Sequence, residues 1–357
     1  MNLLKFILIY TLLISSVVGY GLIFSSKFTN YNSYQNKDLS VGYIGLFGIL
    51  FSILISYLTN FITPHNNLHN IVFLIIGILI FFYYLNKKEI KISKYFIFSY
   101  LISFFALFYF KSHDDFSYYH LSLIDNLTEN KIEFGISQFD IAFNHVSSLF
   151  YFHSLFKTIF TGDYFYQLGQ ISIIIFINTI LLESIFKKKN KEYLNTSFFL
   201  KIFLIIFLNI FFYRLAEHGT DRSAQILFFL VFILTIDLFE NKKIKKDIFE
   251  LIIILFTLII SIKSFYILYS ILFFLIYFKY YKLNDLLKIF KIYPIIYISI
   301  LIFLFTVLSN IAASGCLYTP LPILVLMYFF GDMEKKMYQK QWSGMRFGQK
   351  LEPHRIT

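Results

Sequence analysis

Long apolar stretches recur along this 357-residue chain, and they constrain its fold more than any other feature. A helix needs about 20 mainly apolar residues to cross a bilayer, and about ten stretches approach that length. A soluble core could not absorb them, because 58% of the residues are hydrophobic and only 15% are charged. The sequence therefore predicts an all-α, polytopic bundle of about ten transmembrane helices. The stretches are 3–23, 41–62, 71–85, 95–110, 164–186, 198–213, 224–238, 249–262, 265–281 and 293–309.

Lysine-rich loops indicate the orientation of this bundle, because short cytoplasmic loops collect Lys and Arg. Alternation of the spans places the basic loops on the cytoplasmic side, and it places 111–163 and 216–222 outside. The basic cytoplasmic loops then account for the net charge of +11, and anionic lipid headgroups are their partners. We therefore expect no nucleic-acid partner. The basic loops are 86–94, 187–192, 241–246 and 279–291.

The same scheme divides the chain into successive parts. N-terminal spans occupy 1–110, an external loop occupies 111–163, and a transmembrane bundle with a second external loop occupies 164–311. The remaining residues, 312–357, form an external tail. Most of the five Met and the single Trp fall after residue 322, where Asn and Ile become scarce. This change of composition indicates that the tail is out of frame or truncated.

Several motifs that would specify other chemistries are missing from the sequence. The single Cys316 excludes an internal disulfide, and no CxxC or HExxH spacing is present. A Gly-rich phosphate loop is also absent, which argues against a nucleotide-driven pump. The energy or the leaving group must then come from the membrane or from an activated lipid.

The first external loop begins with a dense group of ionisable residues. His113, Asp114, Asp115, Tyr119 and His120 lie directly after an apolar stretch. Ionisable groups near membrane depth are costly, and they are candidates for function by default. Helical spacing would put Asp115, Tyr119 and His120 on neighbouring turns of one face. The alternative is an acidic N-cap with an aromatic belt at the membrane boundary.

Farther along this loop, 137–160 has apolar residues near helical period. Such a pattern is typical of a helix that lies in the membrane interface. We therefore expect an interfacial helix beside the ionisable group. Its apolar positions are Phe143, Val146, Leu149, Phe150, Phe152, Leu155, Phe156 and Ile159.

The second external loop carries arginine at both ends, in a chain whose basic residues are nearly all lysine. Arg214 and Arg222 flank Glu217, His218 and Asp221. A planar guanidinium binds phosphate or carboxylate in a bidentate manner, which favours a substrate-binding role. The alternative is a pairing of Arg222 with Asp221 or Glu217 that only orders the turn.

The run Asp114-Asp115-Phe-Ser-Tyr-Tyr-His-Leu121 resembles the first external loop of the GT-C class of membrane glycosyltransferases. The pair Ser147-Ser148 and the segments 219–224 and 314–320 also look like a group of uncharacterised bacterial multispan proteins related to that class. The resemblance covers most of the chain. It implies a GT-C-like bundle in a bacterial inner (plasma) membrane, an active face outside, a catalytic aspartate and a polyprenyl-phosphate-linked sugar as donor.

On this resemblance we expect a sugar to pass from the lipid donor to a cell-surface glycan or lipid acceptor. Asp114 or Asp115 would be the general base. The other carboxylate, with His113 or His120, would hold a divalent cation, Mg²⁺ or Mn²⁺, against the lipid phosphate. The remaining substrate- and phosphate-binding candidates are Tyr119, Glu217, His218, Asp221 and Arg222.

Two other functions remain open at this point. An O-antigen polymerase or ligase would use the segment 214–219 instead. A lipid-linked sugar flippase or transporter would need charged groups within broken spans. Few such groups occur, and snorkelling near span ends would account for Glu183, Lys201 and Asp237.

Overall fold

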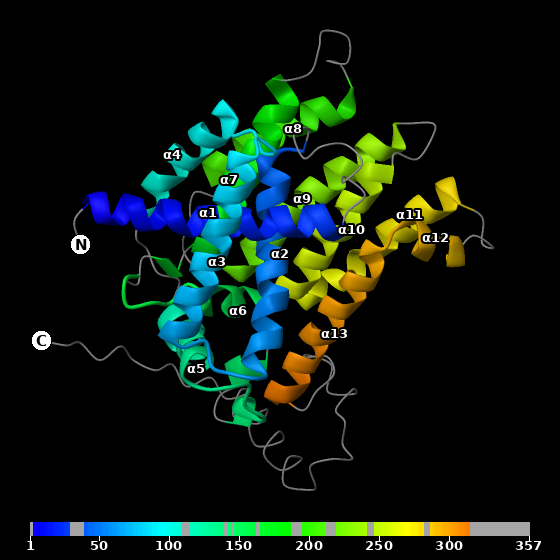
Figure 1. The fold of residues 1–357 in the computed structure, drawn as a ribbon. Helices are drawn as coiled ribbons and strands as arrows, with labels where there is room; N and C mark the ends of the chain where they lie inside the picture. The colour runs from blue at the N-terminus through cyan, green and yellow to red at the C-terminus, as the bar shows by residue number, and fades with distance from the viewer. Residues whose placement is uncertain are drawn as a thin grey trace, which may run out of the picture.

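The computed structural model describes residues 3–28, 39–108, 115–138, 141–144, 146–161, 165–166, 168–186, 195–211, 219–240, 246–281 and 286–314. In these ranges all regular structure is helical, which confirms the predicted all-α class (Figure 1). The long helices are α1 (Leu3–Phe28), α2 (Val41–Asn60), α3 (Asn67–Asn86), α4 (Lys94–Phe108), α7 (Leu168–Phe186), α8 (Thr196–Phe211), α9 (Thr220–Phe239), α10 (Lys246–Ile262) and α13 (Ile295–Ser314). Shorter helices are η3 (Phe116–His120), α5 (Leu121–Glu129), η4 (Ile136–Gln138), η5 (Ile141–Asn144), α6 (Ser148–Ser154), η8 (Ser264–Ser270), α11 (Ile271–Tyr280) and α12 (Leu286–Ile292).

Six helices are long and apolar enough to cross a membrane, namely α1, α2, α3, α7, α9 and α13. Their length and composition confirm a transmembrane helical protein. The other predicted stretches coincide with α4, α8, α10 and the η8–α11 pair, which are shorter helices. The count of about ten spans therefore stays a prediction. Of the predicted external tail, 315–357 lies outside the described residues.

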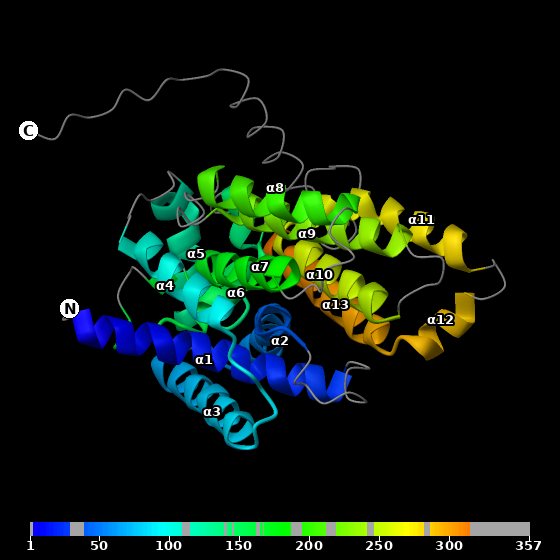
Figure 2. The same ribbon diagram turned by 90° about the horizontal axis from the view of Figure 1, so that it is seen from above.

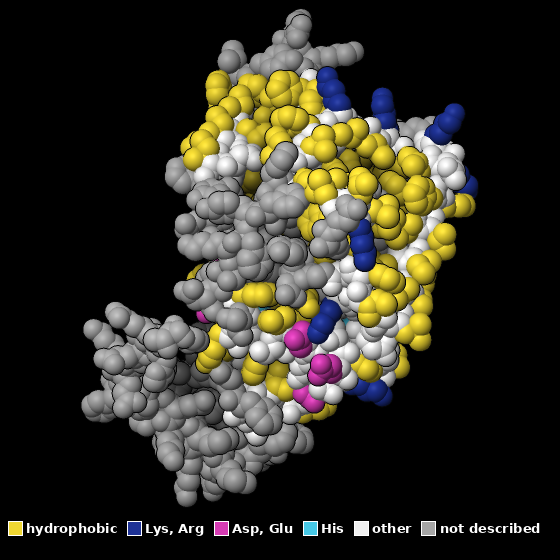
Figure 3. All heavy atoms as spheres, turned by 90° about the vertical axis from the view of Figure 1, so that its left-hand side faces the viewer, with side chains coloured by type: hydrophobic (Ala, Val, Ile, Leu, Met, Phe, Trp, Pro, Cys, Tyr) yellow, Lys and Arg dark blue, Asp and Glu magenta, His cyan; other side chains and the backbone are white. Residues whose placement is uncertain are grey.

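Helix α7 lies in the middle of the bundle, where it contacts α2, α4, α8 and α9 (Figure 2). Most of its length is buried, whereas only a minor part of α3 and of α13 is buried. Figure 3 shows hydrophobic side chains over the upper part of one face, with acidic side chains gathered toward its lower end. Large exposed apolar surfaces of this kind suit contact with lipid. On α3 the exposed apolar residues include Leu68, Val72, Ile75, Ile76, Leu79 and Phe82.

Glycines allow α1 to pass between α2 and α3 at close range (Figure 2). A Cβ added at Gly19 would overlap the carbonyl oxygen of Gly77 in α3, and one at Gly48 of α2 would overlap that of Val17. Small residues at helix contacts let backbones approach closely, which is a main source of packing energy between helices in lipid. A larger side chain at either glycine would force these helices apart.

The expected interfacial helix is replaced by α6, which has only seven residues and is buried throughout. It contacts α2, α5, α7 and α10, so its apolar side chains face protein. A helix that is apolar on all sides is buried, and the side chains of Leu149, Phe150 and Phe152 have at most 2% exposure. The apolar pattern around α6 thus reflects packing in the core, and the large exposed apolar side chains of the segment come after α6.

Lys201 and Asp237 form a buried ion pair between α8 and α9, with Nζ and Oδ2 2.6 Å apart. Their side chains are only 8% and 17% exposed. The snorkelling expected from the sequence is therefore wrong for this pair, because the two charges neutralise each other across the helix contact. Glu183 of α7 is also buried, and it too lies inside the protein rather than in water.

Replacement of Lys201 by Met should lower the free energy of unfolding by about 3–5 kcal/mol, because the Asp237 carboxylate loses the lysine charge in a buried place. The double variant Lys201→Met/Asp237→Leu should recover most of this loss. Reversible unfolding in mixed detergent measures both. As a control, Lys91→Met at an exposed site should change stability by less than about 0.5 kcal/mol. A double variant no more stable than Lys201→Met would contradict this account.

Candidate functional site

A small open cavity lies at the end of the bundle where parts of both predicted external loops meet. Its empty volume is ≈ 390 Å³, with the solvent at its mouth included. Its wall comes from η3, the start of α6, the start of α9, the end of α10 and α13, so only the fold brings these residues together. We call it the loop cavity. Its polar lining residues are Tyr119, Ser147, Thr220, Ser261, Lys263, Ser264, Thr306 and Asn310.

Side-chain hydrogen bonds fasten the first loop to the helix ends around this cavity. Ser147 Oγ donates to the carbonyl oxygen of Ile262 at 2.7 Å, at the end of α10. The backbone N–H of Val146 donates to Oδ1 of Asn310 in α13 at 3.1 Å. Buried backbone groups need such partners, since an unmade bond costs roughly 1–3 kcal/mol. Ser147 and Asn310 therefore hold the cavity wall in place.

Asp221, in the first turn of α9, forms an ion pair with Lys263, which directly follows α10. Asp221 Oδ1 lies 2.6 Å from Lys263 Nζ, and both side chains are partly exposed. An acidic residue in the first turn also favours the helix dipole. The positively charged partner of Asp221 therefore comes from the end of a different helix, α10. Arg222, the next residue, is half-buried in the same first turn.

Tyr119 projects into the cavity from η3 and lies near two carboxylates. Burial raises the pKa of Tyr119 to about 12, and the negative charges of Asp115 and Asp221 contribute to the rise. The phenol is therefore protonated at neutral pH and can donate a hydrogen bond. Asp115 is half-buried at the start of η3. The predicted residues Asp115, Tyr119 and Asp221 are thus brought together, with Arg222 on the same turn as Asp221.

His120 follows Tyr119 but belongs to the packing of the loop. Its side chain is buried, and its ring centroid lies 4.3 Å from that of Tyr119 and 4.7 Å from that of Phe150. It does not line the loop cavity. The reason is the π-helical turn over Phe116–His120, which changes the spacing of side chains from that of an α-helix. Such turns are frequent at functional sites.

Several predicted site residues fall outside the described part of the chain: His113, Asp114, Glu217 and His218. The metal role of Asp114 and Asp115 therefore stays a prediction. Among the described residues, no group of three or more His, Cys, Asp and Glu side chains is placed to hold a metal ion. Mg²⁺ is often bound by one or two carboxylates together with substrate phosphates. The described carboxylates near Tyr119 are those of Asp115 and Asp221.

Lys263 is a residue of the site that was not predicted from the sequence, although a signal was present. This lysine stands alone between two apolar stretches, in a connection that the orientation scheme places outside. Lysine is uncommon in short external loops, so an isolated one there indicates a specific role. Asn310 was missed as well, because nothing in an apolar stretch shows which polar residue will meet the loop.

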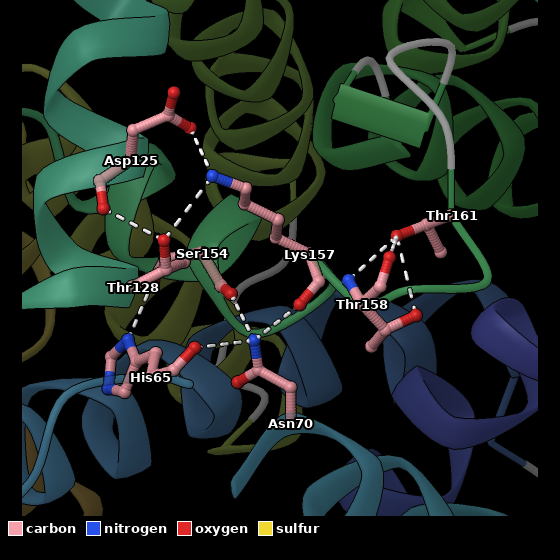
Figure 4. Close-up of polar contacts among 8 residues, drawn as sticks. All are labelled: His65, Asn70, Asp125, Thr128, Ser154, Lys157, Thr158 and Thr161. Atoms are coloured by element: carbon pink, nitrogen blue, oxygen red, sulfur yellow. Dashed lines mark hydrogen bonds and ion pairs between the residues drawn. The ribbon is translucent and has the colours of Figure 1, made fainter. Parts of the chain in front are cut away.

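A second polar cluster joins the same loop to the turn between α2 and α3 (Figure 4). The Nδ2 group of the buried Asn70 donates to the carbonyl oxygens of His65, Ser154 and Lys157 at 2.7–2.8 Å. Lys157 also pairs with Asp125 of α5, with Nζ and Oδ1 2.5 Å apart. The α2–α3 turn, α5 and the end of α6 are thus joined at this end of the bundle.

His65 is the buried titratable group of this cluster. Its Nδ1 lies 2.7 Å from Ser154 Oγ and its Nε2 lies 3.2 Å from the carbonyl oxygen of Ser56. Nε2 also lies 3.1 Å from Thr59 Oγ1, and Ser154 Oγ itself donates to the carbonyl oxygen of Tyr151 at 2.8 Å. Burial lowers the pKa of His65 to about 3, and the positive charge of a protonated His69 nearby adds to the decrease. The ring is therefore neutral.

The helices define a polytopic α-helical membrane protein, and a polar cavity lies at one end of its bundle. A family model described as a domain of unknown function, DUF8201, matches residues 1–343, and the chain belongs to this family. This agrees with the expectation of a family without assigned activity. No curated protein and no solved structure matches the chain. The relation to the GT-C class stays a prediction.

Acid should destabilise the protein through His65. Its pKa is lower in the folded state, so below about pH 6.5 only the unfolded state binds the proton. The free energy of unfolding should fall by up to about 1.4 kcal/mol per pH unit as pH falls from about 6.5 toward 3. His65→Gln, which does not titrate, should show a smaller slope. Melting temperatures in one detergent over this range measure it, and equal slopes in both proteins would contradict the assignment.

Proposed function

We propose that the protein is a membrane glycosyltransferase, which transfers a sugar from a polyprenyl-phosphate donor to a cell-surface glycan or lipid acceptor. The observation that supports this best is that Tyr119 and Lys263 line one cavity at the end of the bundle. The carboxylates of Asp115 and Asp221 lie near Tyr119, and Asp221 pairs with Lys263. Such a site offers a carboxylate base and a cation for phosphate at the depth where a lipid headgroup lies.

In the proposed reaction, an acceptor hydroxyl oxygen attacks the anomeric carbon of the sugar. The bond between that carbon and the phosphate oxygen breaks, and the phosphate leaves on its lipid with the electron pair. Asp115 takes the hydroxyl proton as general base. Lys263 and Arg222 stabilise the negative charge of the leaving phosphate. Tyr119, whose phenol is protonated, donates a hydrogen bond to substrate oxygen.

A divalent cation is part of this proposal, with Mg²⁺ or Mn²⁺ as the candidates. Asp114 or Asp221, rather than the base Asp115, would hold it together with the lipid phosphate. When bound, the ion would supply further neutralisation of phosphate charge. The carboxylates in the described part of the site are compatible with it, because water and phosphate can complete the coordination.

A flippase for a lipid-linked sugar is the second candidate, because the Lys201–Asp237 pair puts charge inside the bundle. The O-antigen polymerase or ligase alternative would use 214–218, which lies outside the described residues. For the transferase we further propose a bacterial inner membrane location, with the loop cavity on the external face, since the basic loops then face the cytoplasm.

Cysteine labelling tests this orientation. In a Cys316→Ser background, Glu129→Cys, near the cavity end, should react with an impermeant maleimide in intact cells. Lys91→Cys, between α3 and α4, should react only after the cells are opened, because it lies in a basic loop. The reverse pattern would put the loop cavity in the cytoplasm and would contradict the proposed external face.

Sugar transfer in proteoliposomes tests the site itself. Asp115→Asn should reduce transfer of labelled sugar from a polyprenyl-phosphate donor by at least ~10²-fold, because the base is lost. Lys263→Met should also reduce turnover, since the phosphate loses a charged partner. Glu129→Gln, exposed and outside the cavity, is the matched control and should keep wild-type transfer.

Two results would contradict the proposed site or the proposed reaction. Full transfer by an Asp114→Asn/Asp115→Asn variant would exclude this carboxylate pair as the base. Movement of lipid-linked sugar across the bilayer without a new glycosidic bond would assign the protein as a flippase.

A further inference from the structure

A short turn at the cavity end of the bundle holds two large apolar side chains at the surface. Ile159 and Phe160 are 74% and 51% exposed, although both lie outside the apolar stretches. Thr161 Oγ1 accepts from the N–H of Thr158 at 2.8 Å, and Thr158 Oγ1 accepts from the N–H of Phe160 at 3.3 Å. Ile159 and Phe160 are therefore exposed on an ordered turn that is held by hydrogen bonds to its own backbone N–H groups.

The turn adjoins the lipid-facing side of a spanning helix. The N–H of Ile159 donates to Oδ1 of Asn67, the first residue of α3, at 2.9 Å. Leu68, the next residue of α3, is 72% exposed, and the exposed apolar side of α3 continues from it. Ile159 and Phe160 thus extend the apolar surface of α3 past its N-terminal end, where the bilayer interface lies if α3 spans the membrane.

The turn is also coupled to the candidate site. Lys157, just before it, pairs with Asp125 of α5, and α5 continues directly from η3, which carries Tyr119 (Figure 4). The depth of the turn in the membrane would therefore set the depth of the cavity. A lysine next to two apolar residues suits the boundary between headgroups and acyl chains, where its charge stays in the polar layer.

We propose that residues 158–161 form an interfacial anchor, with Ile159 and Phe160 inserted among the lipids of the leaflet at the cavity end. The occupant of this apolar surface is lipid, because the surface is continuous with the exposed side of α3. Because α6 is buried, it cannot contact the membrane interface, and residues 158–161 make that contact instead. It does not depend on glycosyl transfer, since it requires only that α3 spans the membrane.

Spin labelling in lipid nanodiscs tests the anchor on the full chain with Cys316→Ser. A nitroxide on Phe160→Cys should collide more often with oxygen, which concentrates in lipid, than with a water-soluble nickel chelate. Its depth should fall between those of Leu79→Cys, exposed midway along α3, and Glu129→Cys, exposed in water at the same end. An insertion of about 5–10 Å is expected for an interfacial apolar segment. Ile159→Cys gives a second, independent reading.

The outcomes separate the possible occupants. A label on Phe160→Cys and Ile159→Cys with the collision ratio of Glu129→Cys would place the turn in water and overturn the proposal. Low collision rates with both reagents would show that protein covers the turn, as in contact with a second copy, and would overturn it as well. A shift of both labels toward oxygen supports it, whatever the transfer assay shows.

Discussion

The side-chain amide of Asn70 determines how the first loop sits on the bundle. It is fully buried, and it bonds the carbonyl oxygens of three residues from two separate segments. Non-helical backbone near a membrane leaves carbonyls without helical partners, and each unsatisfied group is costly where water is scarce. One amide on α3 meets this need for the α2–α3 turn and for the end of α6. The rest of the loop can then turn toward α10 and α13.

The loop also forms hydrogen bonds where it meets α10 and α13. Ser147 donates to a carbonyl at the end of α10, and Asn310 accepts an N–H from the loop. The loop is thus bonded to α10 and α13 as well as to α3, and Tyr119 and Phe150 line the cavity beside Ser147 and Asn310. The cavity follows from this arrangement, since the polar groups that secure the loop also form its wall. The loop side chains that line the cavity are therefore held in position by bonds between the loop and the helices α10 and α13.

The sequence predicts the helices well and the contacts between them poorly. Every expected apolar stretch is helical over most of its described length, because length and hydrophobicity in lipid leave little other choice. The pattern around Phe150 also looked helical, but periodicity alone could not tell a lipid-facing helix from one enclosed by protein. The partners in the ion pairs could not be predicted either, because they lie far apart along the chain. Lys201 pairs with Asp237, 36 residues later, and Asp221 pairs with Lys263, 42 residues later. A charged residue in an apolar stretch implies a partner of opposite charge, but the sequence does not show which residue that partner is.

The ion pair at the cavity bears on how a phosphate would bind there under the proposed function. Lys263 already has a carboxylate partner, so an incoming phosphate must compete with Asp221 for it. Both side chains are partly exposed, and exchange between such partners costs little because exposed pairs are worth about 0–1 kcal/mol. The donor phosphate is a diester with one negative charge, as on a carboxylate, so it competes with Asp221 on nearly equal terms. The second negative charge that develops as the phosphate leaves the sugar then favours its contact with Lys263. Displacement from Lys263 would leave the Asp221 carboxylate near Tyr119 without its lysine, so a bound donor would change the charge that Tyr119 faces.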